Sequence, residues 1–422
     1  MLAAFVFVLT YVGLVYLRPQ EYVPALQGVP VMPVFLAAGL LAWLPQRGKR
    51  LDAPQYWLLP LLLLAMALSV AANGWPGGVV PLAADFLPIM VLFYLIASAT
   101  NTVARHRAFM VALGLFTTVL AAHGIDQANS GIGWSGAELS QGTRITYIGI
   151  FNDPNDLALT FVIAMPMLAY LLSEARGLLA RALWLASMAG VLYAIYLTNS
   201  RGGMLALATQ FMVYTVWRYG PLRASVPAMI GIAALLMLPT RLENLDADEA
   251  SAAGRVDAWY SGIWMLLRNP VFGVGKGNFT EHHPLAAHNF MVLAFAELGL
   301  FGYFLWISFF ALSVYMVYRA SRPGGPPGAQ PGAADPEWER CRKIARTYLF
   351  SMVGFVVAAM FLSRSYNLML FVLCALCVAI FQCMRRQWPA FAPVRFGALA
   401  GRLFALELAS VVFVFLLVKV LL

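Results

Sequence analysis

Residues 56–72 read YWLLPLLLLAMALSVAA without a charged residue, and residues 80–99 read VPLAADFLPIMVLFYLIASA with a single acid, Asp85. An α-helix needs about 17 to 25 mostly apolar residues to cross the hydrocarbon of a bilayer. The whole chain of 422 residues has this character, because 61% of it is hydrophobic, 11% is charged and its mean hydropathy is +0.76. A soluble domain is about 45–50% apolar and about 25% charged. The sequence therefore predicts an all-α polytopic membrane protein and excludes a soluble globular enzyme, a disordered chain and a coiled coil.

We predict twelve membrane-spanning helices and a weaker thirteenth at the C-terminus, within one integral-membrane domain, 1–422. The predicted spans are 2–17, 29–45, 56–72, 80–99, 108–123, 157–172, 182–198, 202–217, 224–239, 299–318, 347–363, 367–384 and 403–421. With the N-terminus in the cytoplasm, 19 of the 28 Lys and Arg residues fall in cytoplasmic loops, as the topological bias of membrane proteins requires. This orientation makes 319–346 a cytoplasmic linker and places two long loops outside, 124–156 and 240–287. The net charge of +9 then follows from the bias and needs no nucleic-acid partner.

The four cysteines are too few for a disulfide framework. Cys374 and Cys377 form a C-x-x-C inside the span 367–384, without a second cysteine pair or a nearby histidine to complete a metal site. We interpret them as small packing residues.

Basic residues on the outer face run against the topological bias, so we expect each of them to have an interaction partner. Arg201 lies in the sequence NSRGG, 199–203, which joins two spans with almost no loop. The two glycines let other groups approach the backbone closely. Contact with an anion is the function that we favour for Arg201, and a side chain that reaches to the bilayer surface is the alternative.

The outer loop 240–287 contains an amphipathic helix, predicted over 254–269. Six residues recur at helical spacing and form one apolar stripe suited to a membrane surface: Val256, Trp259, Tyr260, Ile263, Trp264 and Leu267. Arg255 and Arg268 lie at the two ends of this helix and off the stripe. They either hold an anion at the interface or pair with Asp257 and lipid headgroups.

His288 and Asn289 open another apolar run. A helix that begins there disfavours the imidazolium through its dipole, so the ring stays neutral and can act as a general base. A purely structural role for His288 is the alternative. Glu281, His282 and His283 precede it, but adjacent histidines rarely converge on one ion, so we predict no metal site.

Two further stretches carry polar groups. The turn FNDPND, 151–156, holds the carboxylates of Asp153 and Asp156, and Arg144 lies just upstream. The glycine-rich stretch VFGVGKG, 271–277, lacks the Gly-Lys-Ser/Thr ending of a phosphate loop, so we interpret it as a flexible connection.

Together, five stretches resemble the O-antigen ligase and polymerase superfamily of bacterial envelope proteins. They are GTRITYIGIFNDPNDLAL (142–159), NSRGG (199–203), GRVDAW (254–259), NPVFGVGKGNF (269–279) and HNFMVLAFAELGLFGYFLW (288–306). Their order, their outward placement and the multi-span plan carry the resemblance. The last stretch, with its His, Asn, Glu and Gly in register, is the most specific.

The resemblance implies a glycosyltransferase of the bacterial inner membrane with its active site facing the periplasm. Members of the family transfer a glycan from an undecaprenyl-pyrophosphate carrier without a metal or other cofactor. The acceptor is a hydroxyl of lipid A–core for a ligase, the growing glycan for a polymerase, or a protein side chain for an O-oligosaccharyltransferase. The family's functional positions correspond to Arg201, Arg255 and His288, and further to Arg144 and Asn155. We add Arg268 and Asn289 as candidate substrate-binding residues and favour the ligase.

The chemistry agrees with this assignment, since guanidinium groups can stabilise the charge that grows on a departing diphosphate. Neutral His288 would take the proton of the attacking hydroxyl, which gives inversion at the anomeric carbon. The residues alone leave two other classes of protein open. One is a flippase or transporter of lipid-linked sugars, with the outward arginines along its path. The other is a metal-dependent glycosyltransferase that uses Asp153 and Asp156.

Overall fold

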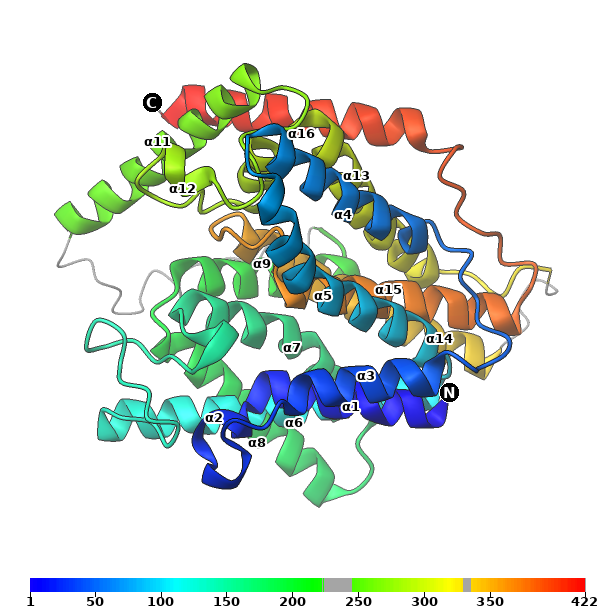
Figure 1. The fold of residues 1–422 in the computed structure, drawn as a ribbon. Coiled ribbons are helices and arrows are strands. Elements are labelled where there is room, and N and C mark those ends of the chain that lie inside the picture. The colour runs from blue at the N-terminus through cyan, green and yellow to red at the C-terminus, as the bar shows by residue number, and fades with distance from the viewer. Residues whose placement is uncertain (222, 224–244, 329–334, 422) are drawn as a thin grey trace.

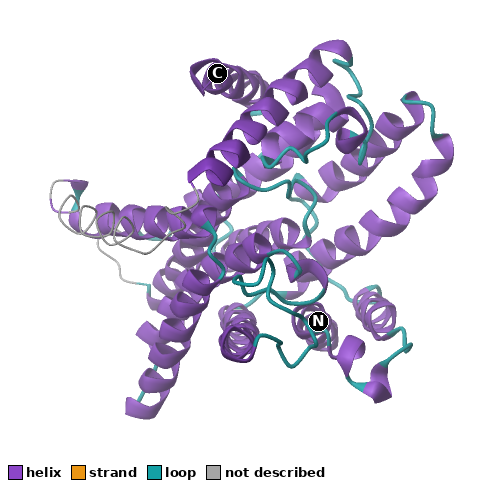
Figure 2. Ribbon diagram, turned by 90° about the vertical axis from the view of Figure 1, so that its left-hand side faces the viewer, coloured by secondary structure: helices purple, strands orange, loops and turns teal. Residues whose placement is uncertain are grey.

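The computed structural model describes residues 1–221, 223, 245–328 and 335–421, and this part of the chain contains helices and loops but no named strand (Figure 2). The α-helices are α1 (Leu2–Leu17), α2 (Pro19–Tyr22), α3 (Val31–Trp43), α4 (Gln55–Ala72), α5 (Val79–Ala99), α6 (Val103–Ser130), α7 (Pro154–Glu174), α8 (Leu178–Leu197), α9 (Arg201–Tyr219), α11 (Leu245–Arg268), α12 (Phe279–His282), α13 (Phe290–Ser321), α14 (Pro336–Ala359), α15 (Leu368–Gln387) and α16 (Ala400–Leu421). Short 3₁₀ turns lie at η1 (Pro24–Leu26), η2 (Pro76–Gly78) and η3 (Gly149–Phe151).

The predicted spans coincide with helices throughout the described residues. Eight of these helices are long and apolar enough to cross a membrane, namely α4, α5 with η2, α6, α7, α8, α13, α15 and α16, while α1 and α3 are apolar but shorter. The predicted spans 202–217 and 347–363 correspond to α9 and α14, which do not reach the same hydropathy. The predicted span 224–239 lies outside the described residues. The fold class is confirmed as an all-α polytopic membrane protein.

Most long helices lie side by side, so their ends gather at two ends of the bundle (Figure 1). One end carries α11, α12 and the loop between α6 and α7, and we call it the loop end. The N-terminus lies at the opposite end. The predicted linker 319–346 is shorter than expected, because α13 continues to Ser321 and α14 already begins at Pro336.

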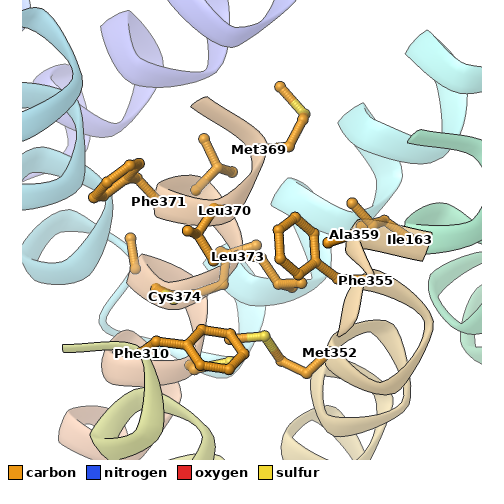
Figure 3. Packing of buried hydrophobic residues seen from close by; sticks show 14 of the residues in the cluster. Ile163, Phe310, Met352, Phe355, Ala359, Met369, Leu370, Phe371, Leu373 and Cys374 are labelled. Carbon is orange, nitrogen blue, oxygen red and sulfur yellow. The ribbon is translucent and has the colours of Figure 1, made fainter. Parts of the chain in front are cut away.

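The core of the bundle surrounds α15, whose residues from Met369 to Met384 are all buried. Phe310 of α13, Met352 and Phe355 of α14 and Ile163 of α7 pack around it (Figure 3). Cys374 and Cys377 are free thiols without exposed surface in this core, which confirms their interpretation as packing residues.

The long helix α13 is broken at Gly299, whose backbone (φ 63°, ψ −172°) is open essentially to glycine alone. The break frees backbone groups, and the glycine-rich stretch 271–277 together with Pro270 satisfies them. Val274 N donates to Ala296 O at 2.9 Å, Gly275 N donates to Glu297 O at 3.1 Å, and Leu300 N donates to Pro270 O at 2.8 Å. Irregular backbone at membrane depth is tolerated only when such partners exist.

The interpretation of 271–277 as a flexible connection is therefore wrong. A Cβ at Gly273 would lie 2.4 Å from the backbone carbon of Glu297, so this glycine is required for close approach to the broken helix. Asn73 of the α4 end further fixes the stretch, because its Nδ2 donates to Gly273 O at 2.9 Å. The stretch therefore fixes the segment after α11 against α13. In this way it holds α11 and α13, which both carry or adjoin candidate site residues, relative to each other.

Candidate active site at the loop end

His288 lies immediately before α13, as the sequence predicts. The helix begins at Phe290 and is capped by Asn289, whose Oδ1 accepts from Met291 N at 2.9 Å and from Val292 N at 3.2 Å. The half-buried His288 itself has a left-handed backbone (φ 45°), and its N–H donates to Ser363 Oγ at 2.7 Å. These bonds fix the backbone of His288 relative to both neighbouring segments.

The environment of His288 keeps its ring neutral. Burial lowers the pKa of His288 below its ordinary value, and the positive charge of Arg255 lowers the pKa further. Arg364 acts in the same direction, while the carboxylate of Asp153 opposes them. The structure thus brings Arg255, Arg364 and Asp153 into the electrostatic range of His288 from three separate segments. A histidine with a lowered pKa is unprotonated at neutral pH and can accept a proton.

A short segment between α14 and α15, residues 360–367, connects the loop-end ends of several helices, and we call it the hub. Ser363 of the hub accepts from His288 N, and Ser365 Oγ donates to Phe290 O at 2.5 Å. On its other side, Phe361 packs against Gly202, next to Arg201, because a Cβ at Gly202 would lie 3.3 Å from that of Phe361. Gly202, next to Arg201, and His288 therefore contact hub residues two positions apart, Phe361 and Ser363.

Arg364 of the hub forms a bidentate ion pair with Asp156 in the first turn of α7. The carboxylate is almost fully buried, whereas a third of the guanidinium side chain is exposed. Asp153 caps the same helix, since its Oδ1 accepts from Asn155 N at 2.7 Å. Both carboxylates that sequence reasoning considered for a metal already have partners within the chain.

Arg144 joins two helix ends beside this pair. Its Nη2 donates to Asn155 Oδ1 at 2.9 Å, and its Nε donates to Thr198 O at 2.8 Å, three residues before Arg201. Two of the predicted substrate-binding residues, Arg144 and Asn155, are therefore in direct contact. The pairing holds a guanidinium between the start of α7 and the turn that precedes α9.

The starts of four helices meet at this site. α7, α9, α13 and α15 each have an N-cap side chain, from Asp153, Ser200, Asn289 and Asn367. Their proximity follows from the hub contacts and from Gly203, where a Cβ would lie 2.8 Å from that of Ala158 in α7. Helix N-termini carry partial positive charge, and guanidinium groups stand among them, so the arrangement suits an anion.

Residues 185–307, from α8 into α13, match a family model described as O-antigen ligase. This segment belongs to the O-antigen ligase superfamily. It contains Arg201, Arg255 and His288, whereas Arg144, Asn155 and the hub lie outside it. A comparison with curated protein sequences finds no match.

The O-antigen ligase segment includes α11, whose helical structure is confirmed but whose apolar face differs from the predicted stripe. Trp259 and Ile263 of the stripe are buried within the chain, and Trp259 Nε1 donates to Ala287 O at 2.9 Å, beside His288. Tyr260, Trp264 and Leu267 of the stripe are exposed, while Ala258, Gly262, Met265 and Leu266 are buried instead. Small residues at 258 and 262 let α11 approach α13, so the buried face is rotated by about one residue.

Arg268 stands apart from the other predicted site residues. It lies thirteen residues beyond Arg255 on α11, which is about 20 Å at the helical rise of about 1.5 Å per residue. Its guanidinium lies 5.9 Å from the ring of Trp264, and both line a cavity of about 520 Å³ with Tyr260 and His282. Asn289, also predicted to bind substrate, is instead fully buried and caps α13.

Sequence reasoning missed the hub and Lys276. Lys276 Nζ lies 4.7 Å from the ring of Tyr366, and its charge acts on the buried Glu297. Arg364 is one of the nine basic residues outside the predicted cytoplasmic loops, but it was not assigned to the site from the sequence. The signal that identified Arg201, an arginine in a short outward turn between two spans, applies equally to Arg364.

Proposed function

We propose that the chain is a membrane glycosyltransferase of the O-antigen ligase type. It transfers a glycan from undecaprenyl pyrophosphate to a hydroxyl of lipid A–core, on the periplasmic side of the bacterial inner membrane. The observation that carries the proposal is the position of His288 at the start of α13, inside the family-matched segment and within the electrostatic range of Arg255, where burial and that charge lower its pKa. The predicted orientation, which places the loop end outside, supports the periplasmic assignment.

The arginines stabilise the departing carrier. As the acceptor oxygen bonds to the anomeric carbon, the bond from that carbon to the diphosphate oxygen breaks, and the electron pair leaves with the carrier pyrophosphate. Arg255 and Arg201 bind the diphosphate oxygens, where fixed guanidinium groups offset the growing charge without solvent reorganisation. Arg144, held by Asn155, adds a third guanidinium at the start of α7.

His288 acts as the general base. Its neutral imidazole takes the acceptor hydroxyl proton while the new glycosidic bond forms, which gives inversion of configuration. Arg255 contributes twice, because its charge binds the phosphate and also lowers the pKa of His288. Glycan transfer and base activation therefore depend on the same helix, α11.

The cavity beside Arg268 suits the carbohydrate rather than the reacting centre. Its exposed aromatic rings, Tyr260 and Trp264, can stack on sugar faces, and Arg268 and His282 can hydrogen-bond hydroxyl or phosphate groups. Arg268 thereby keeps its predicted substrate-binding role, about 20 Å from Arg255 along the helix.

A reconstituted transfer assay tests this function. The purified protein in proteoliposomes receives undecaprenyl-pyrophosphate-linked glycan and lipid A–core, and the glycolipid product is measured by gel and mass spectrometry. We expect His288→Gln to lower the rate by about 10²- to 10⁴-fold, the usual contribution of a general base. Arg340→Ala is the control, because Arg340 is exposed on α14 with Glu337 as its ion-pair partner.

The products separate the remaining candidates. Glycan on lipid A–core supports a ligase, longer carrier-linked glycan indicates a polymerase, and glycosylated protein indicates an O-oligosaccharyltransferase. Covalently unchanged substrates that cross the bilayer would indicate a transporter. Wild-type transfer by a folded His288→Gln protein would overturn the assignment of the base.

A further inference from the structure

A second cavity lies between α7, α8, α9 and α14, away from His288. It has a volume of about 500 Å³, within the range of small-molecule sites. Its lining includes Tyr170 and Ser173 from the end of α7, Trp217 and Arg218 from the end of α9, and Lys343 from the beginning of α14. These helix ends lie opposite the starts of α7 and α9 that form the candidate active site. We call this cavity the lateral groove.

The walls of the lateral groove are apolar along its length. Met165, Met188 and Leu207 line it towards the middle of the bundle, and Phe211 and Phe350 line it further out. Phe211 is 48% exposed, on a helix whose neighbouring aromatic residues Tyr214 and Trp217 are 42% and 48% exposed. Three large rings exposed on one side of a helix are typical of a surface that meets lipid rather than water.

Three cations gather at one end of this apolar groove, namely Arg218, Lys343 and Arg346. The Arg346 guanidinium lies 4.2 Å from the centre of the Trp217 ring, and Lys343 Nζ lies 5.4 Å from that of Tyr170. Lys343 also pairs with Glu174. The apolar part of the groove thus suits an acyl chain. Its positively charged end lies at the level of the lipid headgroups.

We propose that the lateral groove binds one anionic phospholipid, with an acyl chain along α7 and α9 and the phosphate between Arg218, Lys343 and Arg346. Charge complementarity selects this occupant. A soluble phosphate would leave the apolar length of the groove unfilled. A neutral lipid would bring no net negative charge to the three cations, of which Lys343 already pairs with Glu174. The basic end belongs to the predicted cytoplasmic side, where anionic headgroups attract Lys and Arg.

Binding there would stabilise the packing of three helices. Gln210 forms part of the groove lining, and its Nε2 donates at 3.0 Å to both Val162 O of α7 and Phe350 O of α14. A lipid between these helices adds contacts to a junction that already joins α7, α9 and α14. We therefore expect bound phospholipid to raise the thermal midpoint of the full-length protein.

The experiment measures lipid binding and the thermal midpoint of the purified full chain. Delipidated protein in neutral detergent is titrated with phosphatidylglycerol or with phosphatidylcholine, and bound lipid is counted by native mass spectrometry. We expect one tightly bound phosphatidylglycerol and weaker binding of phosphatidylcholine. Each cation near a membrane surface contributes roughly 1 kcal/mol to anionic lipid binding, so Arg218→Ala and Arg346→Ala should each weaken phosphatidylglycerol binding about fivefold.

A groove-filling variant and a surface control complete the design. Leu207→Trp should fill the groove and weaken binding of the lipid's acyl chain without removing a charge. The Arg340→Ala protein should bind phosphatidylglycerol as the wild type does. Inorganic phosphate should neither compete nor raise the thermal midpoint. Equal binding of the two phospholipids, unchanged binding by Arg218→Ala, Arg346→Ala and Leu207→Trp, or competition by inorganic phosphate would each overturn the proposal.

Discussion

Gly299→Ala should destabilise the protein more than an ordinary glycine substitution does. The backbone of Gly299 has a positive φ of 63°, and a Cβ there would lie 2.4 Å from the carbonyl carbon and oxygen of Val271. These contacts are with backbone, so they cannot be relieved by turning a side chain. The glycine-rich stretch and the broken helix would have to separate.

The magnitude can be worked out from these contacts. Holding a residue other than glycine in this region of φ/ψ space costs about 1 to 3 kcal/mol. Separation also weakens the hydrogen bonds from Leu300 N to Pro270 O and from Phe301 N to Val271 O, each of which contributes about 1 kcal/mol. We expect the free energy of unfolding to fall by about 3 to 5 kcal/mol.

Denaturant titration in mixed micelles measures this change, and Gly190→Ala is the matched control. Gly190 lies within α8, and no heavy atom would lie within 4 Å of an added Cβ. The same substitution there should stabilise the helix by up to about 1 kcal/mol. If Gly299→Ala unfolds at the wild-type denaturant concentration, the break in α13 is not a required feature of the fold.

Three further results are expected. Arg364→Ala should lower the free energy of unfolding by about 3 kcal/mol, because it leaves the buried carboxylate of Asp156 without its partner. The double variant with Asp156→Asn should recover part of this loss. If the losses of the two single variants simply add in the double variant, the ion pair is contradicted. Transfer activity should be constant around neutral pH and fall only below the ordinary histidine pKa of about 6.5. The reason is that the pKa of His288 is lowered, and the base is lost when the pH falls through the pKa of His288. A loss of activity that begins above about pH 6.5 on the acid side of the pH–rate profile would refute this. Treatment with EDTA should leave transfer unchanged, because Asp153 and Asp156 have partners within the chain; loss of activity restored by a divalent cation would support the metal-dependent alternative.

The helices could be predicted because apolar residues extend over lengths that only a membrane core explains. Every predicted span within the described residues coincides with a helix. The break at Gly299 could not be found in this way, since apolar residues continue on both sides of it. Its cause lies in a segment that starts about thirty residues earlier, which supplies the missing hydrogen-bond partners.

The face of α11 that packs against α13 does not follow from the predicted apolar stripe, for a different reason. A stripe of large apolar residues marks the most hydrophobic side of a helix, but close packing favours small residues at the contact. Gly262 would bring an added Cβ to 2.4 Å from Val292, so the contact with α13 lies over this glycine. The large rings of Tyr260 and Trp264 are consequently free to line a cavity.

Asn289 could be interpreted from the sequence either as a helix N-cap or as a substrate-binding residue. An Asn immediately before an apolar helical run is a standard N-cap signal, and its side chain fulfils that role here. Its position beside His288 suggested substrate binding, but full burial and two bonds to backbone N–H groups occupy the side-chain oxygen. The cap instead fixes the direction in which α13 leaves His288.

The hub explains how residues far apart in sequence can form one site. Arg364 and Asp156 are separated by 208 positions, and His288 and Ser363 by 75, so no local pattern could have paired them. Catalytic geometry requires side chains held to within about 0.5 Å by groups that are themselves fixed. The hub contributes to such fixation, because Arg364 pairs with α7, Ser365 bonds to α13 and Phe361 packs against α9, while α14 and α15 hold the two ends of the hub. A change in the hub should therefore alter His288 and the guanidinium groups together, whereas a change in any one helix should alter only the residue that it carries.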